Sequence, residues 1–197
     1  MTIDTENLPK SVPNFINGAA VNPTAGESIP VLEPASGKTI ARVPESTPGD
    51  LDDAVRAAAD AQKKWRTVPV KERVQILYRF RHLLEQNQER LAELCTLENG
   101  KTLSESRAEI AKGIECTEFA CSLPQIVQGQ VLEVSSGVEC KTLRQPVGVV
   151  AGITPFNFPA MVPMWVFPLA IACGNAFILK PSEQTPLCAV ELAKLMK

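Results

Sequence analysis

The strongest constraint on the fold is a run of 35 residues, 145–179, that contains no Asp, Glu, Lys, Arg or His. The run is longer than a membrane-spanning helix needs to be. It also contains Pro146, Pro155, Pro159, Pro163 and Pro168. A lipid-exposed helix broken so often would leave backbone groups unpaired in hydrocarbon. We therefore expect a buried strand, a loop, a short helix and a second buried strand, and membrane association through this run is the weaker alternative.

The overall composition indicates a globular protein that does not bind nucleic acid by bulk charge. The 197 residues are 45% hydrophobic and 21% charged, and 20 Lys and Arg are balanced by 22 Asp and Glu. No basic excess is available to neutralise phosphates. The first ten residues lack a secretory or transit signal, so we expect a cytoplasmic protein with reduced cysteines. With one histidine and no CxxC pair, we expect no metal site.

The residues before the uncharged run predict two hairpins followed by four helices. Asn17-Gly18 and the turn Pro34–Gly37 favour short antiparallel strands. Thr47 and Pro48 are typical of a helix start. Helical spacing predicts one buried stripe on each helix. The stripes are Leu51, Val55, Ala58 and Trp65; Val74, Leu77, Phe80 and Leu84; Leu91, Leu94 and Cys95; and Leu103, Ile110, Ile114, Thr117 and Cys121. We assign these stripes no chemistry, and we expect His82 to be exposed.

Residues 146–197 predict a strand, a helix, a second strand and a second helix. The run Val147–Ile153 is apolar without alternation, which is typical of a parallel strand covered on both faces. Gly174-Asn175 predicts the end of the first helix, and 176–179 predicts the second strand. Two parallel strands do not make a stable doubly wound sheet, so we expect that further strands follow residue 197 in a longer protein.

Polar residues follow both predicted strands, at the edge where open α/β sheets bind ligands. The Asn157 amide, within 154–158, could donate a hydrogen bond to an oxyanion, or it could simply bind loop carbonyls. Lys180 and Glu183, the first charges after the uncharged run, could bind ribose hydroxyls or a phosphate. Alternatively, Glu183 complements a helix N-terminus and Lys180 is solvated.

Other nucleotide or nucleophile signatures are missing from the sequence. It contains neither GxGxxG nor GxxxxGK[ST], and one histidine cannot support a convincing Ser-His-Asp or Cys-His arrangement. The cysteines are expected to be inert buried thiols.

The order of several short motifs resembles the aldehyde dehydrogenase superfamily. The motifs are Phe15-Ile-Asn-Gly18, Leu97-Glu-Asn-Gly-Lys101, Thr154-Pro-Phe-Asn-Phe-Pro159, Gly174-Asn175 and Leu179-Lys-Pro-Ser-Glu183. The run 155–165, followed by Phe167-Pro168, is most similar to the CoA-acylating branch that contains the methylmalonate- and malonate-semialdehyde dehydrogenases. The resemblance extends from about Pro13 to the end. In the family the nucleophilic cysteine comes later, so the chain is similar to the N-terminal portion only.

This resemblance implies an α/β fold, namely an incomplete doubly wound, Rossmann-like cofactor domain. Residues 1–128 would form its N-terminal hairpins and helices, and 146–197 would form the βαβα part of the NAD-binding domain. The predicted hairpin at 129–145 would belong to the oligomerisation sheet of a homotetramer.

The resemblance also implies a reaction. A cysteine thiolate attacks a semialdehyde, the Asn157 amide holds the oxyanion, hydride passes to NAD, and coenzyme A takes the thioester. The residues that match cofactor contacts are Thr154, Phe156, Lys180, Glu183 and Gln184, the last commonly Arg in this branch. Lys112 stands where the branch often has an arginine associated with the substrate carboxylate. We expect the chain alone to be inactive. The alternatives are a non-catalytic fragment that only folds or associates, and another aldehyde dehydrogenase branch.

Overall fold

Two short β-hairpins form at the predicted turn sequences. The computed structural model describes residues 8–23 and 26–197. In it β1 (Asn14–Ile16) pairs antiparallel with β2 (Ala19–Val21), and β3 (Ser28–Leu32) with β4 (Thr39–Pro44). The φ angles of Asn17 and Gly18 are 53° and 74°. Positive φ at both central residues is what a tight hairpin turn requires.

The helices follow in the predicted order. They are α1 (Pro48–Trp65), α2 (Val70–Gln86), α3 (Gln88–Asn99), α4 (Leu103–Cys121) and the short α5 (Leu123–Ile126). A capping box between Thr47 and Asp50 starts α1. The predicted stripes of α2 and α3 are buried, and His82 is exposed, as expected. On α4, Leu103 is half-buried and the other stripe residues are buried.

The predicted stripe of α1 is partly wrong. Leu51 and Val55 are 55% and 40% exposed, so the N-terminal half of this face is not covered by the described residues. Polar side chains fix the C-terminal half instead. Gln62 Nε2 donates a hydrogen bond of 3.2 Å to the carbonyl of Gly174, and Trp65 Nε1 donates one of 2.8 Å to the carbonyl of Ile171. The position of α1 is therefore set by contacts that periodicity does not encode.

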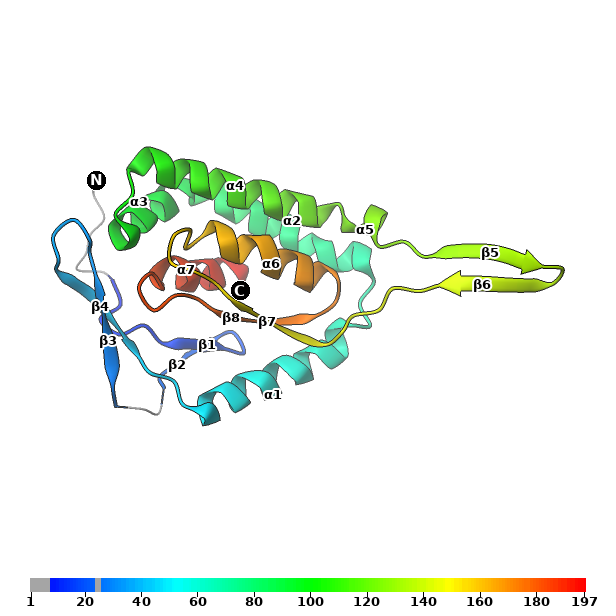
Figure 1. Cartoon of the computed structure of the whole chain (residues 1–197), viewed down its shortest axis with the longest axis horizontal. Helices are drawn as coiled ribbons and strands as arrows, with labels where there is room; N and C mark the ends of the chain where they lie inside the picture. The colour runs from blue at the N-terminus through cyan, green and yellow to red at the C-terminus, as the bar shows by residue number, and fades with distance from the viewer. Residues whose placement is uncertain (1–7, 24–25) are drawn as a thin grey trace.

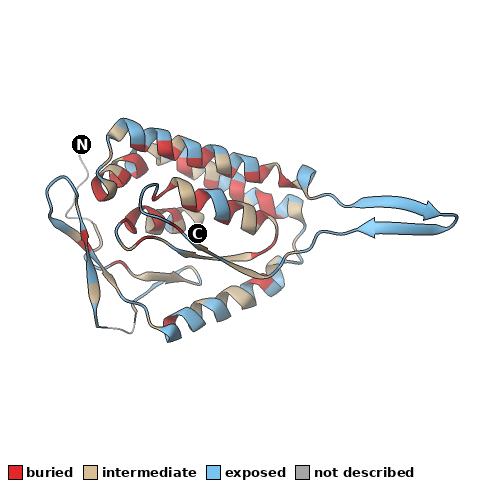
Figure 2. Ribbon diagram, in the orientation of Figure 1, coloured by how far each residue is buried: buried red, intermediate tan, exposed pale blue. Residues whose placement is uncertain are grey.

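A second kind of hairpin projects from the helices. Strands β5 (Gln130–Ser135) and β6 (Val138–Thr142) pair antiparallel and extend far from the rest of the chain (Figure 1). Every residue of both strands is exposed (Figure 2). The structure thus confirms a hairpin within 129–145.

The C-terminal part forms the predicted βαβα unit. Strand β7 (Val149–Ile153) pairs parallel with β8 (Ala176–Lys180), and α6 (Met161–Ala172) connects them. The helix α7 (Leu187–Met196) follows β8. In Figure 1 the two strands run between α1 and α6. Gly174, with φ of 90°, follows the C-cap residue Cys173 of α6, so the helix ends where the sequence predicts.

The two strands are less buried than their composition predicts. No residue of β7 or β8 is buried, Ala151 in the middle of β7 is exposed, and Val147 and Ile153 are 84% and 83% exposed. The expectation of strands covered on both faces is therefore wrong along their whole length. The reason is the width of the sheet, because β7 and β8 are its two strands within the described residues. None of the helices described is long and apolar enough to cross a membrane. The uncharged run is divided between short strands and the 12-residue α6.

The main core lies mostly between the helices, and Val31 of β3 and Ala41 of β4 belong to it as well. Its largest fully buried side chains include Phe80, Leu84, Leu91, Ile110, Met164 and Leu192. Helices α4 and α6 approach closely at Gly113, where an added Cβ would lie 1.9 Å from Met164 Cε. This packing brings α6, and the loop before it, against α4.

Candidate functional site

The loops that follow β7 and β8 are held together by one backbone hydrogen bond and one side-chain contact. The N–H of Thr154 donates a hydrogen bond of 3.0 Å to the carbonyl of Lys180. The Thr185 hydroxyl lies 3.5 Å from the carbonyl of Phe156. The parallel register explains the contact of Thr154 with Lys180, because Ile153 pairs with Lys180 at the end of both strands. The two segments singled out in the sequence therefore meet at one edge of the sheet.

The Asn157 side chain is exposed at this edge. The carbonyls of its loop are bound from elsewhere. Asn99 Nδ2 donates to the carbonyl of Phe156 at 2.8 Å, and Lys101 Nζ donates to the carbonyl of Asn157 at 2.8 Å. The Lys101 ammonium also lies 4.4 Å from the centre of the Phe158 ring. The carbonyls of this loop are therefore bound by Asn99 and Lys101, at the α3–α4 junction, and not by the Asn157 amide as one of the two sequence-based alternatives had it.

Lys180 and Glu183 form an exposed ion pair. Lys180 Nζ lies 2.8 Å from Glu183 Oε2, and the two side chains are 58% and 41% exposed. The hydrogen bond from Lys180 lowers the pKa of the Glu183 carboxyl, which is therefore ionised at neutral pH. Glu183 does not cap α7, since Glu98 accepts from the first N–H groups of that helix. Both charges remain accessible to a ligand.

The other predicted cofactor residues lie around the same pair of loops. Phe156 is 52% exposed and Gln184 is exposed, and the backbone N–H of Gln184 donates to Ser182 Oγ at 3.2 Å. Thr154 is buried, and its hydroxyl has no hydrogen-bond partner within the described residues. An accessible carboxylate and ammonium suit a ribose diol. The residues fit a dinucleotide.

Two buried glutamates near these loops were missed by the sequence analysis. Glu98 on α3 is 2% exposed and accepts hydrogen bonds from the N–H groups of Leu187 and Cys188, at 2.7 and 2.9 Å. Burial raises the pKa of Glu98 to about 7. The sequence does contain a sign of this role. Glu98 lies seven residues after Leu91, on the buried stripe of α3, and a buried carboxylate needs hydrogen-bond partners.

Glu109 plays the corresponding part on α4. It is 3% exposed, and its Oε1 accepts from the N–H groups of Ala160 and Met161 at 2.9 and 3.1 Å. Its Oε2 accepts from Lys101 Nζ and, at 3.3 Å, from Cys95 Sγ. Each of the two loops at the edge is therefore followed by a helix whose first turn is held by a buried glutamate.

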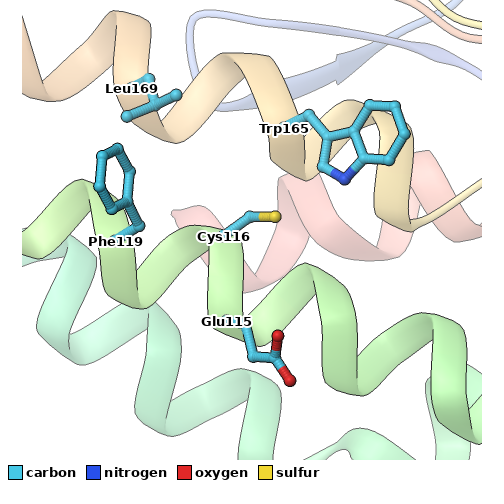
Figure 3. Close-up of a pocket in the computed structure, with 5 residues that line it drawn as sticks. All are labelled: Glu115, Cys116, Phe119, Trp165 and Leu169. Carbon is cyan, nitrogen blue, oxygen red and sulfur yellow. The ribbon is translucent and has the colours of Figure 1, made fainter.

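A groove of about 330 Å³ lies between α4 and α6. Glu115, Cys116, Phe119, Trp165 and Leu169 line it (Figure 3). Burial raises the pKa of the Cys116 thiol, so this cysteine is protonated at neutral pH. Lys112 lies on α4 rather than at the edge of the sheet. Its ammonium lies 2.7 Å from the carboxylate of Glu115, and Glu115 is one of the residues that line the groove.

The chain is similar to a known protein family over most of its length. The family described as "Aldehyde dehydrogenase family" matches residues 21–197. Malonate-semialdehyde dehydrogenase 2 of Geobacillus thermodenitrificans is 52% identical over 187 residues, and that of Bacillus mycoides is 52% identical over 189. These matches cover 94% and 95% of this chain and 39% of each relative. The chain thus spans about 39% of the length of these relatives.

Solved structures are similar as well. One is the NAD complex of a protein assigned as a methylmalonate-semialdehyde dehydrogenase from Sinorhizobium meliloti, with 40% identity and a TM-score of 0.93. Another is a methylmalonate-semialdehyde dehydrogenase from Oceanimonas doudoroffii, with 38% identity and a TM-score of 0.92. They cover 96% and 95% of this chain, and the chain covers 39% and 38% of theirs.

Proposed function

The chain belongs to the aldehyde dehydrogenase family, and we propose that it is the N-terminal part of an NAD-dependent methylmalonate- or malonate-semialdehyde dehydrogenase. The enzyme would oxidise a semialdehyde to an acyl-CoA through a cysteine thioester, with coenzyme A as the second substrate. The names of the relatives support the substrate class. The observation that carries the proposal is the contact of Thr154 with Lys180, which joins the Asn157 loop to the Lys180–Glu183 pair.

In this proposal NAD would be held at the carboxyl edge of β7 and β8. Lys180 and Glu183 would bind the adenosine ribose, because both side chains are accessible and opposite in charge. Thr154 and Phe156 would contribute backbone contacts along the cofactor, and Gln184 a further contact. When bound, NAD would supply the acceptor for the hydride.

Asn157 would act on the substrate. When a cysteine thiolate adds to the aldehyde carbon, negative charge develops on the aldehyde oxygen, and the exposed amide donates a hydrogen bond to it. A donor of this kind is worth about 3 kcal/mol in a dry site. The nucleophile would lie outside these 197 residues. Cys116, the cysteine in the groove, does not fit that role, because burial keeps its thiol protonated.

The groove between α4 and α6 would admit the semialdehyde. Lys112 would exchange its partner Glu115 for the substrate carboxylate. It would orient that carboxylate more weakly than an arginine does, since an ammonium lacks the two-pronged geometry of a guanidinium. The protein would work in the cytoplasm as a homotetramer, with the hairpin within 129–145 between subunits. The domain division at 128 and 145 is part of the same proposal.

The test uses the longer enzyme to which the chain would belong. Asn157→Ala should lower kcat/KM for malonate semialdehyde by about a hundredfold or more. Gln86→Ala, which removes an exposed amide from α2, is the matched control and should leave kcat/KM unchanged. A loss smaller than about tenfold for Asn157→Ala would contradict the proposed role.

The non-catalytic alternative is tested on the 197-residue chain itself. We expect it to produce no NADH when an aldehyde, NAD and coenzyme A are supplied, because the nucleophile would be missing. Aldehyde-dependent NADH production by this chain would refute both the expected inactivity and the alternative of a fragment that only folds or associates.

A further inference from the structure

We propose that Lys101 is a positioning residue for the Asn157 amide and that the buried carboxylate of Glu109 holds Lys101 in place. The inference rests on the proposed function of Asn157 and adds to it two residues from the α3–α4 region. Neither touches the predicted cofactor residues through any contact described above.

The Lys101 ammonium is fixed by three groups. It donates a hydrogen bond of 2.8 Å to the carbonyl of Asn157, and it pairs with Glu109 Oε2. It also lies 4.4 Å from the centre of the Phe158 ring, within the range of a cation–π contact. The Lys101 side chain is only 12% exposed. Its charge is therefore used within the protein rather than solvated.

Glu109 ties this ammonium to the start of α6. Its side chain is fully buried, and both of its oxygens accept hydrogen bonds. Oε1 accepts from the N–H groups of Ala160 and Met161, so one carboxylate holds the segment both at Asn157, through Lys101, and three residues later. A buried charge of this kind is costly when one partner is removed. The geometry of the segment is therefore strongly determined.

The backbone at Asn157 is restrained on both sides. Asn99 Nδ2 donates to the carbonyl of Phe156, and Lys101 donates to the next carbonyl along the chain. The two donors come from either side of Gly100, whose φ of 84° ends α3. Because the Asn157 side chain is exposed, the direction of its amide depends on these backbone restraints. A misplacement of about 1 Å in such a group can cost a hundredfold in rate.

The kinetic test uses the longer enzyme. Lys101→Met should lower kcat about tenfold or more, and the KM for NAD should not change, because the Lys180–Glu183 pair is untouched. Lys101→Arg, which keeps the charge, should restore part of the loss. The control is Lys63→Met, which breaks an ion pair of 2.8 Å with Asp60 in which both side chains are 74% exposed. This control should leave kcat unchanged.

A double-mutant cycle separates positioning from general structural damage. If Lys101 acts through Asn157, Lys101→Met should cause little further loss in an Asn157→Ala background. Full additivity of the two losses would overturn the inference while leaving the proposed function intact. If Asn157→Ala alone has no effect, the proposed function fails instead.

A second readout does not depend on activity. In NMR spectra of the 197-residue chain, the side-chain amide resonances of Asn157 should shift in Lys101→Met and stay in place in Lys63→Met. Glu109→Gln should shift them as well, and the amide hydrogens of Ala160 and Met161 should exchange faster. Unchanged Asn157 resonances in Lys101→Met would overturn the inference whatever the kinetics show.

Discussion

The Glu98 carboxylate on α3 accepts a hydrogen bond of 2.7 Å from the backbone N–H of Leu187, which lies 89 residues further along the chain. It also accepts one from Cys188. The residue before α7 is Pro186, whose side chain has no acceptor for these N–H groups. Glu109 on α4 binds the first turn of α6 in the same way. Two buried glutamates thus attach α6 and α7, the helices of the βαβα unit, to α4 and α3.

The first prediction concerns pH. Burial raises the pKa of Glu98 from 4.5 to about 7, so between these values the folded chain holds a proton that the unfolded chain has lost. The free energy of unfolding should therefore fall as the pH rises from about 4.5 to 7, by up to about 3 kcal/mol, and Glu98→Gln should abolish this part of the fall. Urea unfolding of the 197-residue chain across about pH 4–8 measures it.

The exposed Glu85→Gln should keep the pH dependence of the unmodified chain and is the control. If the stability of Glu98→Gln ran parallel to that of the unmodified chain over this range, Glu98 would not be the group responsible.

The second prediction separates function from stability at Lys180. Its ion pair with Glu183 is exposed, so Lys180→Ala should change the free energy of unfolding by less than about 0.5 kcal/mol. In the longer enzyme the same change should weaken NAD binding about tenfold, through the loss of one charged hydrogen bond. Lys194→Ala, which breaks an ion pair of 3.3 Å with Glu191, should affect neither quantity appreciably. Equal NAD affinities of the two variants would count against the ribose assignment.

The third prediction concerns the contact between α4 and α6. A Cβ added at Gly113 would lie 1.9 Å from Met164 Cε, and both residues are buried. Gly113→Ala should therefore destabilise the chain in denaturant unfolding, because the end of the fully buried Met164 side chain has to move. An overpacking cost of about 1–3 kcal/mol is offset in part by the roughly 1 kcal/mol that alanine gains over glycine inside a helix. The cost should be smaller in a Met164→Ala background, because the shorter side chain leaves room. Gly26→Ala meets no atom within 4 Å and should be nearly neutral.

The fourth prediction concerns the start of α1. The Thr47 hydroxyl accepts a hydrogen bond from the N–H of Asp50, and the Asp50 carboxylate accepts one from the N–H of Thr47. Thr47→Ala should cost about 1 kcal/mol in thermal or denaturant unfolding, and Thr47→Ser should cost much less because it keeps the acceptor. Similar losses for the two variants would show that the hydroxyl is not what stabilises the helix start.

The parts of the fold that the sequence predicts well are those set by local rules. The turn at Asn17-Gly18 needs positive φ, and the stop at Gly174 needs a left-handed residue, so both can be recognised within a few residues. The stripe of α2 follows from helical spacing alone. The parallel pairing of β7 with β8 follows from the uncharged run and the helix between them.

The rest depends on partners that are distant in sequence. Leu51 and Val55 satisfy the pattern of a buried face, but burial requires something to cover that face. At the candidate site the strand ends predict where Asn157 and Glu183 lie. The contact of Lys101 with Asn157 spans 56 residues, and that of Glu98 with Cys188 spans 90. No local rule links such pairs, although a glutamate on a buried stripe indicates that a partner exists.

The β5–β6 hairpin has a consequence for how this protein can change over generations. Since all of its strand residues are exposed, substitutions there leave the interior between α2, α4 and α6 untouched. Substitutions in the β5–β6 hairpin therefore have little effect on how the rest of the chain folds. Any restraint on these side chains comes from outside the described residues, and substitutions that alter such a contact leave the edge of β7 and β8 unchanged.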